Sequence, residues 1–343
     1  MPDIEDIAVI APHFKRRLSG VTSTIIQLVP RQVAAGLKIA TLGPGLPPGL
    51  PAMRYRQLAG LWRPLPGGRP RIWHARRNVE MLAGIVLRDI LRMKLRLLFT
   101  SASQRRHTRY TRWLIARMDH VVATSGKTAS YLAVPHTVVM HGIDTARFRP
   151  ATGGRQQPHV IGCAGRIRHQ KGTDLFIDAL IELLPRYPAW RGEAIGRVTA
   201  GHEGFADDLR RRIAAAGLSG RLTLAEETTD IAEWYRGLDL YVAPSRTEGF
   251  GLTPLEAMAS GVPAIAGDVG AYPEIIVAGE TGAVVPTGDL KAYVAAIEPY
   301  LADPGLARRH GENALTHVRA RFDIGNEVRG LNAVYAALWS NGT

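Results

Sequence analysis

The chain has 343 residues, of which 46% are hydrophobic and 21% charged, a composition that is typical of folded domains and excludes intrinsic disorder. With 43 Lys and Arg against 30 Asp and Glu, the net charge of +13 indicates an anionic partner, such as nucleic acid, a phospholipid surface or a phosphorylated substrate. The excess is uneven, because residues 1–150 hold 24 basic and 7 acidic side chains, whereas residues 151–343 hold 19 and 23. The basic character therefore belongs to the first half of the chain.

A single cysteine, Cys163, excludes an intramolecular disulfide and a cysteine-based zinc site. The first residues are acidic and lack the basic segment and the long apolar segment of a signal peptide, so we expect a cytoplasmic location. The longest uncharged stretches, such as residues 18–30 and 39–53, fall short of the roughly 18 apolar residues of a membrane span. We therefore expect any membrane contact to be peripheral.

In the first half, short apolar runs alternate with longer helical patterns, which predicts βα units that feed a parallel sheet. Segments rich in Gly and Pro, at residues 44–51 and 64–70, are predicted to be loops. Gly36 is predicted to end the first helix, because glycine suits a left-handed cap. The predicted strands cover residues 7–11, 38–42, 71–75, 95–100, 120–123 and 137–140, and the predicted helices cover residues 21–35 and a segment from about residue 78.

The segment 150–158 contains Gly, Pro and polar residues with almost no apolar side chain, which indicates an interdomain linker. We place the boundary there, so that residues 1–152 form the first domain and residues 153–325 the second. The last predicted helix has apolar residues at three- and four-residue steps, and we expect residues 326–343 to pack back on the first domain. In this half the predicted strands cover residues 160–164, 197–201, 222–224, 240–243 and 264–266, and the predicted helices cover residues 174–184, 205–216 and 306–338.

The alternation of strands and helices favours an α/β architecture of two Rossmann-like, doubly wound domains in tandem, facing a central cleft. In such sheets, ligands bind at the carboxyl ends of the strands. The loops that follow predicted strands are therefore the places to look for chemistry.

The loop after the strand predicted at residues 240–243 holds the densest signal. It places Glu248 among glycines, which let backbone N–H groups approach a ligand closely. Thr253 and Glu256 fit a capping box at the start of a helix, which is an alternative to a ligand role for Glu256. Glu248 has no such structural role, so the pattern indicates a ligand contact.

A second loop, at residues 165–172, follows a predicted strand and precedes a helix. Arg166 and Lys171 would stand there beside a helix N-terminus, where two cations and the backbone dipoles suit a diphosphate. A solvated basic loop is the alternative. Neither a Walker A loop nor a GxGxxG motif is present, which speaks against ATP hydrolysis and NAD binding.

Candidate residues also follow strands in the first half. Gly20 enters a helix after the first strand, a position where a phosphate can bind helix N–H groups. His74 ends the strand predicted at residues 71–75 and is either an acid/base or hydroxyl-binding group or a structural histidine. The basic segment 76–96 is interpreted as core elements with solvated arginines, and a lipid-facing surface is the alternative.

Four features together resemble the retaining GT-B glycosyltransferases of family 4. They are the pair Glu248 and Glu256, the loop with Arg166 and Lys171, the Pro-Ser dipeptide before the first glutamate, and the sequence HGIDTARFRP before the linker. The opening PHFKRRLSGVTSTI and the segment RIWHARRNVEML are similar to lipopolysaccharide core mannosyltransferases of Gram-negative bacteria. The chain departs from the family pattern at Gly20, which follows a serine where the family often has a second glycine.

The resemblance implies a role for each candidate residue. Glu248 would contact hydroxyls of the donor sugar, and Glu256 would bind the ribose of the nucleotide. Arg166 and Lys171 would clamp the diphosphate, while His74 would contact the sugar near its reacting carbon. Further donor contacts are expected from Gly20, Gly249, Phe250, Gly251 and Leu252, and we assign the basic cluster of Arg105, Arg106 and Arg109 to an anionic group of the acceptor.

The implied reaction is retaining transfer of a hexose, most specifically mannose from GDP-mannose, to an anionic glycolipid of the lipopolysaccharide-core type. Because a diphosphate is a good leaving group, cations should carry the catalysis, and no Asp-x-Asp motif suits a metal, so we expect no metal and no other cofactor. We expect the enzyme on the cytoplasmic face of the inner membrane.

Several alternatives remain open at this point. The donor could be UDP-glucose, UDP-galactose or ADP-heptose, because no motif specifies the base or the sugar. A nucleotide-sugar-binding protein without turnover is a second alternative. A basic nucleic-acid-binding protein is a distant third, because zinc-finger spacing and an RRM-type signature are absent.

Overall fold

The computed structural model describes residues 3–15, 20–153 and 158–340, and the chain divides into two compact units. The first unit joins Met1–Gly142 with Ile324–Thr343, and the second is Ile143–Asp323. The sequence-based boundary assigns residues 143–152 to the first domain, but in the structure they pack in the second unit. The N–H of Ile143 donates to the carbonyl of Phe322 at 2.8 Å, and the ring of Phe148 packs on Tyr235.

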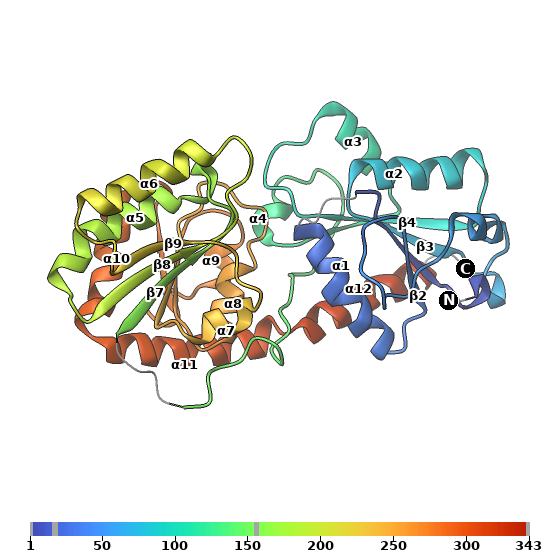
Figure 1. Ribbon diagram of the computed structural model, residues 1–343. Helices are drawn as coiled ribbons and strands as arrows, with labels where there is room; N and C mark the ends of the chain where they lie inside the picture. Colours follow the sequence, from blue (N-terminus) through green and yellow to red (C-terminus); the bar gives the residue numbers. More distant parts are fainter. Residues whose placement is uncertain (1–2, 16–19, 154–157, 341–343) are drawn as a thin grey trace. The chain divides into compact units, whose positions relative to one another are not determined.

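The first unit is built on a six-stranded sheet in the order β2-β1-β3-β4-β5-β6, with all neighbours parallel (Figure 1). Its strands are β1 (Val9–Pro12), β2 (Ile39–Leu42), β3 (Arg71–Ala75), β4 (Leu95–Ser101), β5 (His120–Ala123) and β6 (Thr137–Val138). Its helices are α1 (Gly20–Ala34), α2 (Asn78–Ile85), α3 (Arg109–Ile115), α4 (Gly126–Ala129) and α12 (Ile324–Ser340), with short turns η1 (Ile4–Asp6), η2 (Tyr55–Trp62), η3 (Pro66–Gly68) and η4 (Val86–Ile90).

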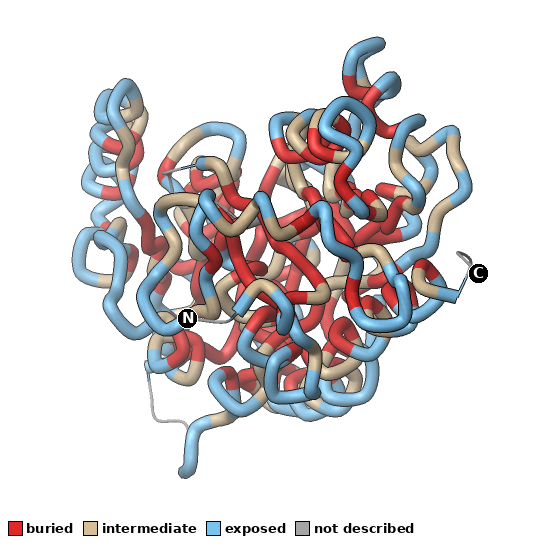
Figure 2. The backbone as a smooth tube through the Cα atoms, turned by 90° about the vertical axis from the view of Figure 1, so that its right-hand side faces the viewer, coloured by how far each residue is buried: buried red, intermediate tan, exposed pale blue. Residues whose placement is uncertain are grey.

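Both faces of this sheet are covered, because successive residues of a strand point to opposite faces. Ile72 of β3 and Leu98 of β4 pack in a core with α1 and α12, whereas Trp73 and Phe99 pack in a second core with α2 and α3. Figure 2 shows the strands buried along most of their length while the outer turns are exposed. The apolar stripe predicted for the last helix is buried on the first of these cores.

The second unit is also a parallel six-stranded sheet, in the order β12-β11-β10-β7-β8-β9. Its strands are β7 (His159–Ala164), β8 (Trp190–Ile195), β9 (Leu222–Ala225), β10 (Leu240–Ala243), β11 (Ala264–Gly267) and β12 (Gly282–Val285). Its helices are α5 (Thr173–Leu183), α6 (Glu203–Ala215), α7 (Ile231–Arg236), α8 (Thr253–Ala259), α9 (Tyr272–Ile275), α10 (Leu290–Ala302) and α11 (Pro304–Arg321), with short turns η5 (His169–Lys171) and η6 (Leu184–Arg186).

Helices α5, α6 and α10 cover one face of the second sheet, and α7, α8 and most of α11 cover the other (Figure 1). In the core under α5, α6 and α10, Trp190 and Tyr293 are among the fully buried side chains. These helix layers leave the carboxyl ends of the strands free to carry loops, which positions the site.

Most of the predicted strands are present, and β3, β5 and β10 have the predicted bounds. The strand predicted at residues 197–201 is wrong. The strand that follows α5 is β8, which ends at Ile195, and Val198 makes only an isolated bridge with Ile167. The single helix predicted at residues 306–338 is also wrong, because α11 ends at Arg321 and α12 begins at Ile324.

Strand order determines which loops meet. In the second sheet the order reverses between β7 and β10, and in the first sheet it reverses between β1 and β3. Loops that leave adjacent strands at such a switch point diverge to opposite faces and leave a crevice at the carboxyl ends. In the second unit, these are the two loops that the sequence selects.

Candidate functional site

The two charged loops of the second unit meet in the structure. Lys171, at the end of the loop after β7, forms an ion pair with Glu248, 77 positions away in the loop after β10. The carboxylate of Glu248 also accepts the N–H of Gly249 at 3.1 Å, and the hydroxyl of Tyr272 lies 3.5 Å from it. About a fifth of each charged side chain is exposed, so the pair is shielded but reachable.

Glycines allow the backbones of these loops to touch. Gly172 has a left-handed backbone (φ +70°), and a Cβ there would lie 1.9 Å from the carbonyl oxygen of Pro244. Gly251 is also left-handed (φ +88°), and a Cβ there would lie 2.2 Å from the ring of Tyr272. A side chain at Gly172 would force the two loops apart, and one at Gly251 would collide with Tyr272.

Sequence analysis missed the residue that ties the two loops together. Arg246 makes two hydrogen bonds to the carboxylate of Asp174, at 2.7 and 2.8 Å, and donates to the carbonyl of His169 at 2.8 Å. Its backbone N–H donates to the carbonyl of Gln170 at 2.9 Å. Arg246 therefore holds the turn that carries Lys171, and neither the spacing nor the residue types indicate this pairing before the strand order is known.

The loop after β7 presents further positive charge. Arg166 is exposed and has no ion-pair partner within the described residues. The buried Nε of Arg168 likewise lacks a hydrogen-bond partner there, and burial together with the charge of Arg166 lowers the pKa of Arg168. With Lys171 just before α5, these groups give the loop a positive charge, and diphosphate binding there stays a prediction.

Glu256 does not form the predicted capping box. Its carboxylate accepts the hydroxyl of Tyr235 at 2.9 Å, and α8 has no side-chain cap. Burial raises the pKa of Glu256, while the hydrogen bond from Tyr235 and the charge of Arg147 lower it. The capping interpretation is therefore wrong, and ribose binding stays a prediction.

The predicted backbone contacts lie directly beside Glu248. Phe250 is buried, and its carbonyl accepts the N–H of Ala271 at 3.0 Å. Leu252 precedes the first residue of α8 and serves as its N-cap. The contacts of this turn with a donor stay predictions.

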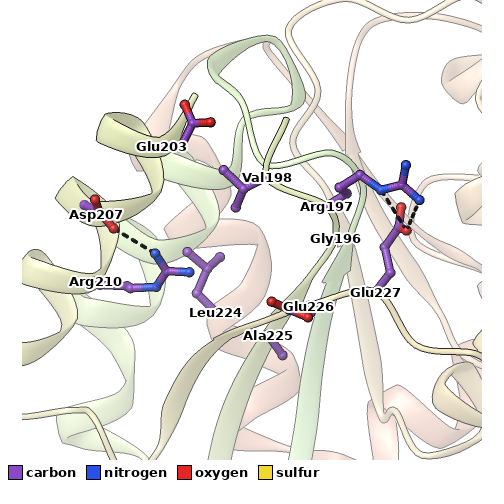
Figure 3. A pocket seen from close by; sticks show the side chains of 10 residues that line it. All are labelled: Gly196, Arg197, Val198, Glu203, Asp207, Arg210, Leu224, Ala225, Glu226 and Glu227. Carbon is purple, nitrogen blue, oxygen red and sulfur yellow. Dashed lines mark hydrogen bonds and ion pairs between the residues drawn. The ribbon is translucent and has the colours of Figure 1, made fainter. Parts of the chain in front are cut away.

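A cavity of about 600 Å³ lies at the carboxyl ends of β8 and β9 and was not found from the sequence (Figure 3). Its charged side chains include Arg197, which pairs with Glu227 at 2.7 Å, whereas Glu226 has no hydrogen-bond or ion-pair partner in the described ranges. The cavity adjoins the cationic loop, because a Cβ at Gly196 would lie 1.8 Å from the carbonyl oxygen of Gly165. The cavity and the cationic loop thus lie side by side within the second unit.

In the first unit, Gly20 is the first residue of α1, and the serine before it lies outside the described residues. His74 is fully buried, with Nδ1 2.7 Å from the hydroxyl of Tyr335 and Nε2 2.6 Å from that of Thr100. Burial and the nearby charge of Arg76 hold the pKa of His74 well below its usual range, so the ring is neutral at pH 7. A sugar hydroxyl could bind a ring nitrogen only after one of these two bonds breaks.

The structure places the three arginines of the cluster predicted for the acceptor differently, and their contacts with an acceptor stay predictions. Arg105 lines a small cavity at the carboxyl end of β4, whereas Arg106 and Arg109 are exposed and do not line it. Across the described ranges, no three His, Cys, Asp or Glu side chains are grouped to hold a metal ion. None of the helices described is long and apolar enough to cross a membrane.

Residues 144–317 match the family described as "Glycosyl transferases group 1". The chain belongs to this family. This glycosyltransferase is 59% identical to the lipopolysaccharide core biosynthesis mannosyltransferase LpcC of Rhizobium leguminosarum bv. viciae, over 98% of each chain. It is 55% identical to the lipopolysaccharide core biosynthesis mannosyltransferase LpsB of Rhizobium meliloti (strain 1021), over 98% of this chain and 99% of that protein.

Solved structures confirm the predicted fold class. This glycosyltransferase resembles a glycosyltransferase from Rickettsia africae ESF-5 with a TM-score of 0.83 and 17% identity, over 98% and 99% of the two chains. It resembles Anabaena HepE in complex with UDP and glucose with a TM-score of 0.80 and 17% identity, over 96% and 99%. At such identities the similarity concerns the fold alone, which is the GT-B fold with two Rossmann-like sheets.

Proposed function

We propose that this glycosyltransferase moves mannose from GDP-mannose to an anionic lipopolysaccharide-core glycolipid, with retention of the anomeric configuration. The observation that carries the proposal is the meeting of Lys171 and Glu248 at the switch point of the second sheet, next to Arg166. A cationic clamp and a carboxylate in one place suit a sugar attached to a diphosphate. The names of LpcC and LpsB support the choice of mannose and of the core acceptor.

In the proposed reaction, Arg166 and Lys171 bind the diphosphate and Glu248 binds sugar hydroxyls. The acceptor oxygen bonds to the anomeric carbon on the face from which the diphosphate leaves, and the broken carbon–oxygen bond gives its electron pair to the diphosphate. The acceptor proton passes to a phosphate oxygen of the donor. The sugar passes through an oxocarbenium-like state, and the fixed cations stabilise the charge that develops on the leaving group. No metal and no cofactor takes part in this scheme.

We assign the cavity beside the cationic loop to the guanine base. Guanine presents an N1–H and an N2 amino group on one edge, and two such donors fit one carboxylate, whereas uracil presents a single N–H. Glu226 is the carboxylate of this cavity that has no partner in the described chain. Glu226→Gln should therefore raise the KM for GDP-mannose about tenfold, whereas Glu312→Gln on α11, outside the cavity, should leave it unchanged.

One assay tests the whole proposal. The purified protein is incubated with an anionic core glycolipid and, separately, GDP-mannose, UDP-glucose, UDP-galactose and ADP-heptose, and nucleotide release is followed. Activity with GDP-mannose, full activity in EDTA and an α-anomeric product by NMR are expected. Activity with another donor alone would overturn the choice of mannose, and metal-dependent turnover would overturn the cation-based scheme. Unchanged transfer by Glu248→Ala would remove Glu248 from the mechanism.

We also propose that the first unit touches an anionic membrane surface. In the basic segment 76–96, Arg88 and Arg96 both form ion pairs with Asp119, at 2.8 and 3.1 Å, so we do not assign them to lipid binding. An exposed apolar cluster lies nearby, because the indole N–H of Trp62 donates to the carbonyl of Leu91 at 2.6 Å, and Trp62 and Leu91 are 50% and 42% exposed. Aromatic and apolar side chains beside arginines are typical of membrane-interface contacts.

The matching experiment is flotation with vesicles. Ile90 and Arg92 flank Leu91, and both are exposed. The double variant Ile90→Ser and Arg92→Glu should lose binding to vesicles that contain phosphatidylglycerol, and neither the wild type nor the variant should bind purely zwitterionic vesicles. Equal binding of the wild type and the double variant to the anionic vesicles would overturn the membrane contact. Nothing in the described residues favours the nucleic-acid alternative.

A further inference from the structure

A small cavity in the first unit has no role in the transfer scheme above. It has a volume of about 280 Å³ and lies at the carboxyl end of β4, bordered by Ser101, by the first residue of α2 and by the start of α3. This volume is below the roughly 300–1,000 Å³ of sites that enclose a whole small-molecule ligand. The cavity is therefore suited to a single chemical group and not to a nucleotide sugar.

The charge in this cavity is positive. Arg76 and Arg105 line it, and no carboxylate does. Glu80, two residues after Asn78 of the lining, is fully buried and already paired, because its carboxylate accepts the guanidinium N–H of Arg77 at 3.0 Å and the backbone N–H of Arg76 at 2.8 Å. The guanidinium of Arg105 is exposed and has no ion-pair partner in the part of the chain that the structure describes. Two guanidinium groups are thus left without a carboxylate.

Polar atoms without partners are concentrated in the same loop. Ser101 is 1% exposed, and its Oγ has no hydrogen-bond partner among the described residues. The Nε2 of His107, which also lines the cavity, and the Nε2 of Gln104 three residues earlier are buried and equally unpaired. Buried polar groups are normally hydrogen-bonded, so three unpaired groups within one loop require a partner.

Other polar residues of the cavity are hydrogen-bonded to one another. The amide of Asn78 donates to the hydroxyl of Thr111 at 2.8 Å, and that hydroxyl lies 3.0 Å from the hydroxyl of Thr108. Among the lining residues, Ser101 and His107 therefore carry the unpaired buried atoms. One acceptor group would suit all three, since a serine hydroxyl, a glutamine amide and the Nε2–H tautomer of an imidazole can all donate.

We propose that this cavity binds a phosphate or carboxylate group of the acceptor glycolipid, with Arg76 and Arg105 as ion-pair partners and Ser101 and His107 as hydrogen-bond donors. An anion supplies several acceptor oxygens at one point and satisfies the charges and the unpaired donors together. The assignment rests on the proposed transfer to an anionic acceptor. It makes the cavity a specificity site, because a neutral acceptor would leave the two arginines without an anionic partner.

The first test is kinetic. Ser101→Ala removes an unpaired buried hydroxyl without a change of charge, so the variant should fold with an unchanged or higher melting temperature. Its KM for the acceptor should rise about tenfold while kcat and the KM for GDP-mannose stay unchanged, and Arg105→Gln should behave alike. Arg56→Gln, which removes an exposed arginine of η2 outside the cavity, is the charge-matched control.

The second test measures binding alone and identifies the anion. The full chain is titrated with glucose 6-phosphate, glucuronate and glucose while the ring signals of His107 are followed by NMR. A shift with glucose 6-phosphate assigns the site to phosphate, and a shift with glucuronate assigns it to carboxylate. In either case glucose should have no effect, and the shift should disappear in Ser101→Ala.

The cavity proposal and the proposed function can each be refuted without the other. If transfer is normal and both variants keep the wild-type KM for the acceptor, the cavity proposal is overturned and the proposed function stands. If no donor is turned over, the proposed function is overturned, and the titration still decides whether the cavity binds anions. A shift of equal size with glucose would also overturn the anion site.

Discussion

Gly172 is the point where the two loops of the second unit's site touch, and Gly172→Ala tests whether this contact positions Lys171. The left-handed backbone of Gly172 costs a non-glycine residue roughly 1–2 kcal/mol. In addition, the new Cβ would lie 1.9 Å from the oxygen of Pro244, so the loops must separate by about 1.5 Å to reach an ordinary contact of 3.4 Å. Forced overpacking of this kind costs roughly 1–3 kcal/mol.

The separation moves Lys171, the preceding residue, away from Glu248. Because a displacement of about 1 Å at a reacting centre can cost roughly 100-fold in rate, we expect kcat/KM for GDP-mannose to fall about 100-fold. The free energy of unfolding should fall by roughly 2–5 kcal/mol, which is the backbone cost and the overpacking cost together. Steady-state kinetics and denaturant unfolding measure the two effects.

Gly217→Ala is the matched control. Gly217 has nearly the same backbone (φ +69°), but a Cβ there would have nothing within 4 Å. This variant should lose only the roughly 1–2 kcal/mol of the left-handed backbone and keep its kcat/KM. If Gly172→Ala equals Gly217→Ala in both measurements, the close approach of the loops does not position Lys171 and the reasoning is refuted.

Three further predictions concern other buried groups. Asp174→Asn breaks the ion pair with Arg246. The variant should lose about 2 kcal/mol of unfolding free energy, which is less than the loss of a fully buried pair would cost, and its kcat/KM should fall about tenfold. Because burial lowers the pKa of His74, the unfolded chain takes up the proton first as the pH falls, so stability should decrease from pH 7 to pH 5, with a shallower slope in His74→Gln. Burial raises the pKa of Cys163 to about 12, so iodoacetamide at pH 8 should label the thiol only after unfolding.

Each of these predictions has a clear contrary outcome. A stable, fully active Asp174→Asn would show that Arg246 does not hold the turn. An unchanged pH slope in His74→Gln would mean that other histidines carry the proton uptake. Labelling of native Cys163 at the rate found for the unfolded chain would show that the thiol is accessible.

The loops of the site could be predicted from the sequence because their signals are local. Glycines and charged residues directly after an apolar strand mark Arg166, Lys171 and Glu248 without knowledge of the fold. The pairing of Lys171 with Glu248 could not be predicted, because it depends on β7 lying next to β10, and strand order is set by packing over the whole sheet. Arg246 and the unpaired groups around Ser101 were missed for the same reason.

The two errors in secondary structure also have tertiary causes. Strand β8 carries Gly192, which local propensity disfavours, but a Cβ there would lie 2.3 Å from the side chain of Leu180 on α5. The packing of α5 on the sheet thus requires a glycine within the strand. The long C-terminal helix is interrupted because Phe322 is buried and Asp323 forms a bridge with Ile143, a contact remote in sequence.

Helix α12 has a consequence for the order of folding during synthesis. It completes the first unit, since Tyr335 bonds His74 and Glu327 bonds both His141 and the N–H of Gly142, at 2.8 Å each. The ribosome makes this helix after the entire second unit. The second unit can therefore fold while synthesis continues, whereas one apolar face of the first sheet is covered only in part, by α1, until α12 has been made. Early termination before α12 would release a protein with an intact second unit and an aggregation-prone first one.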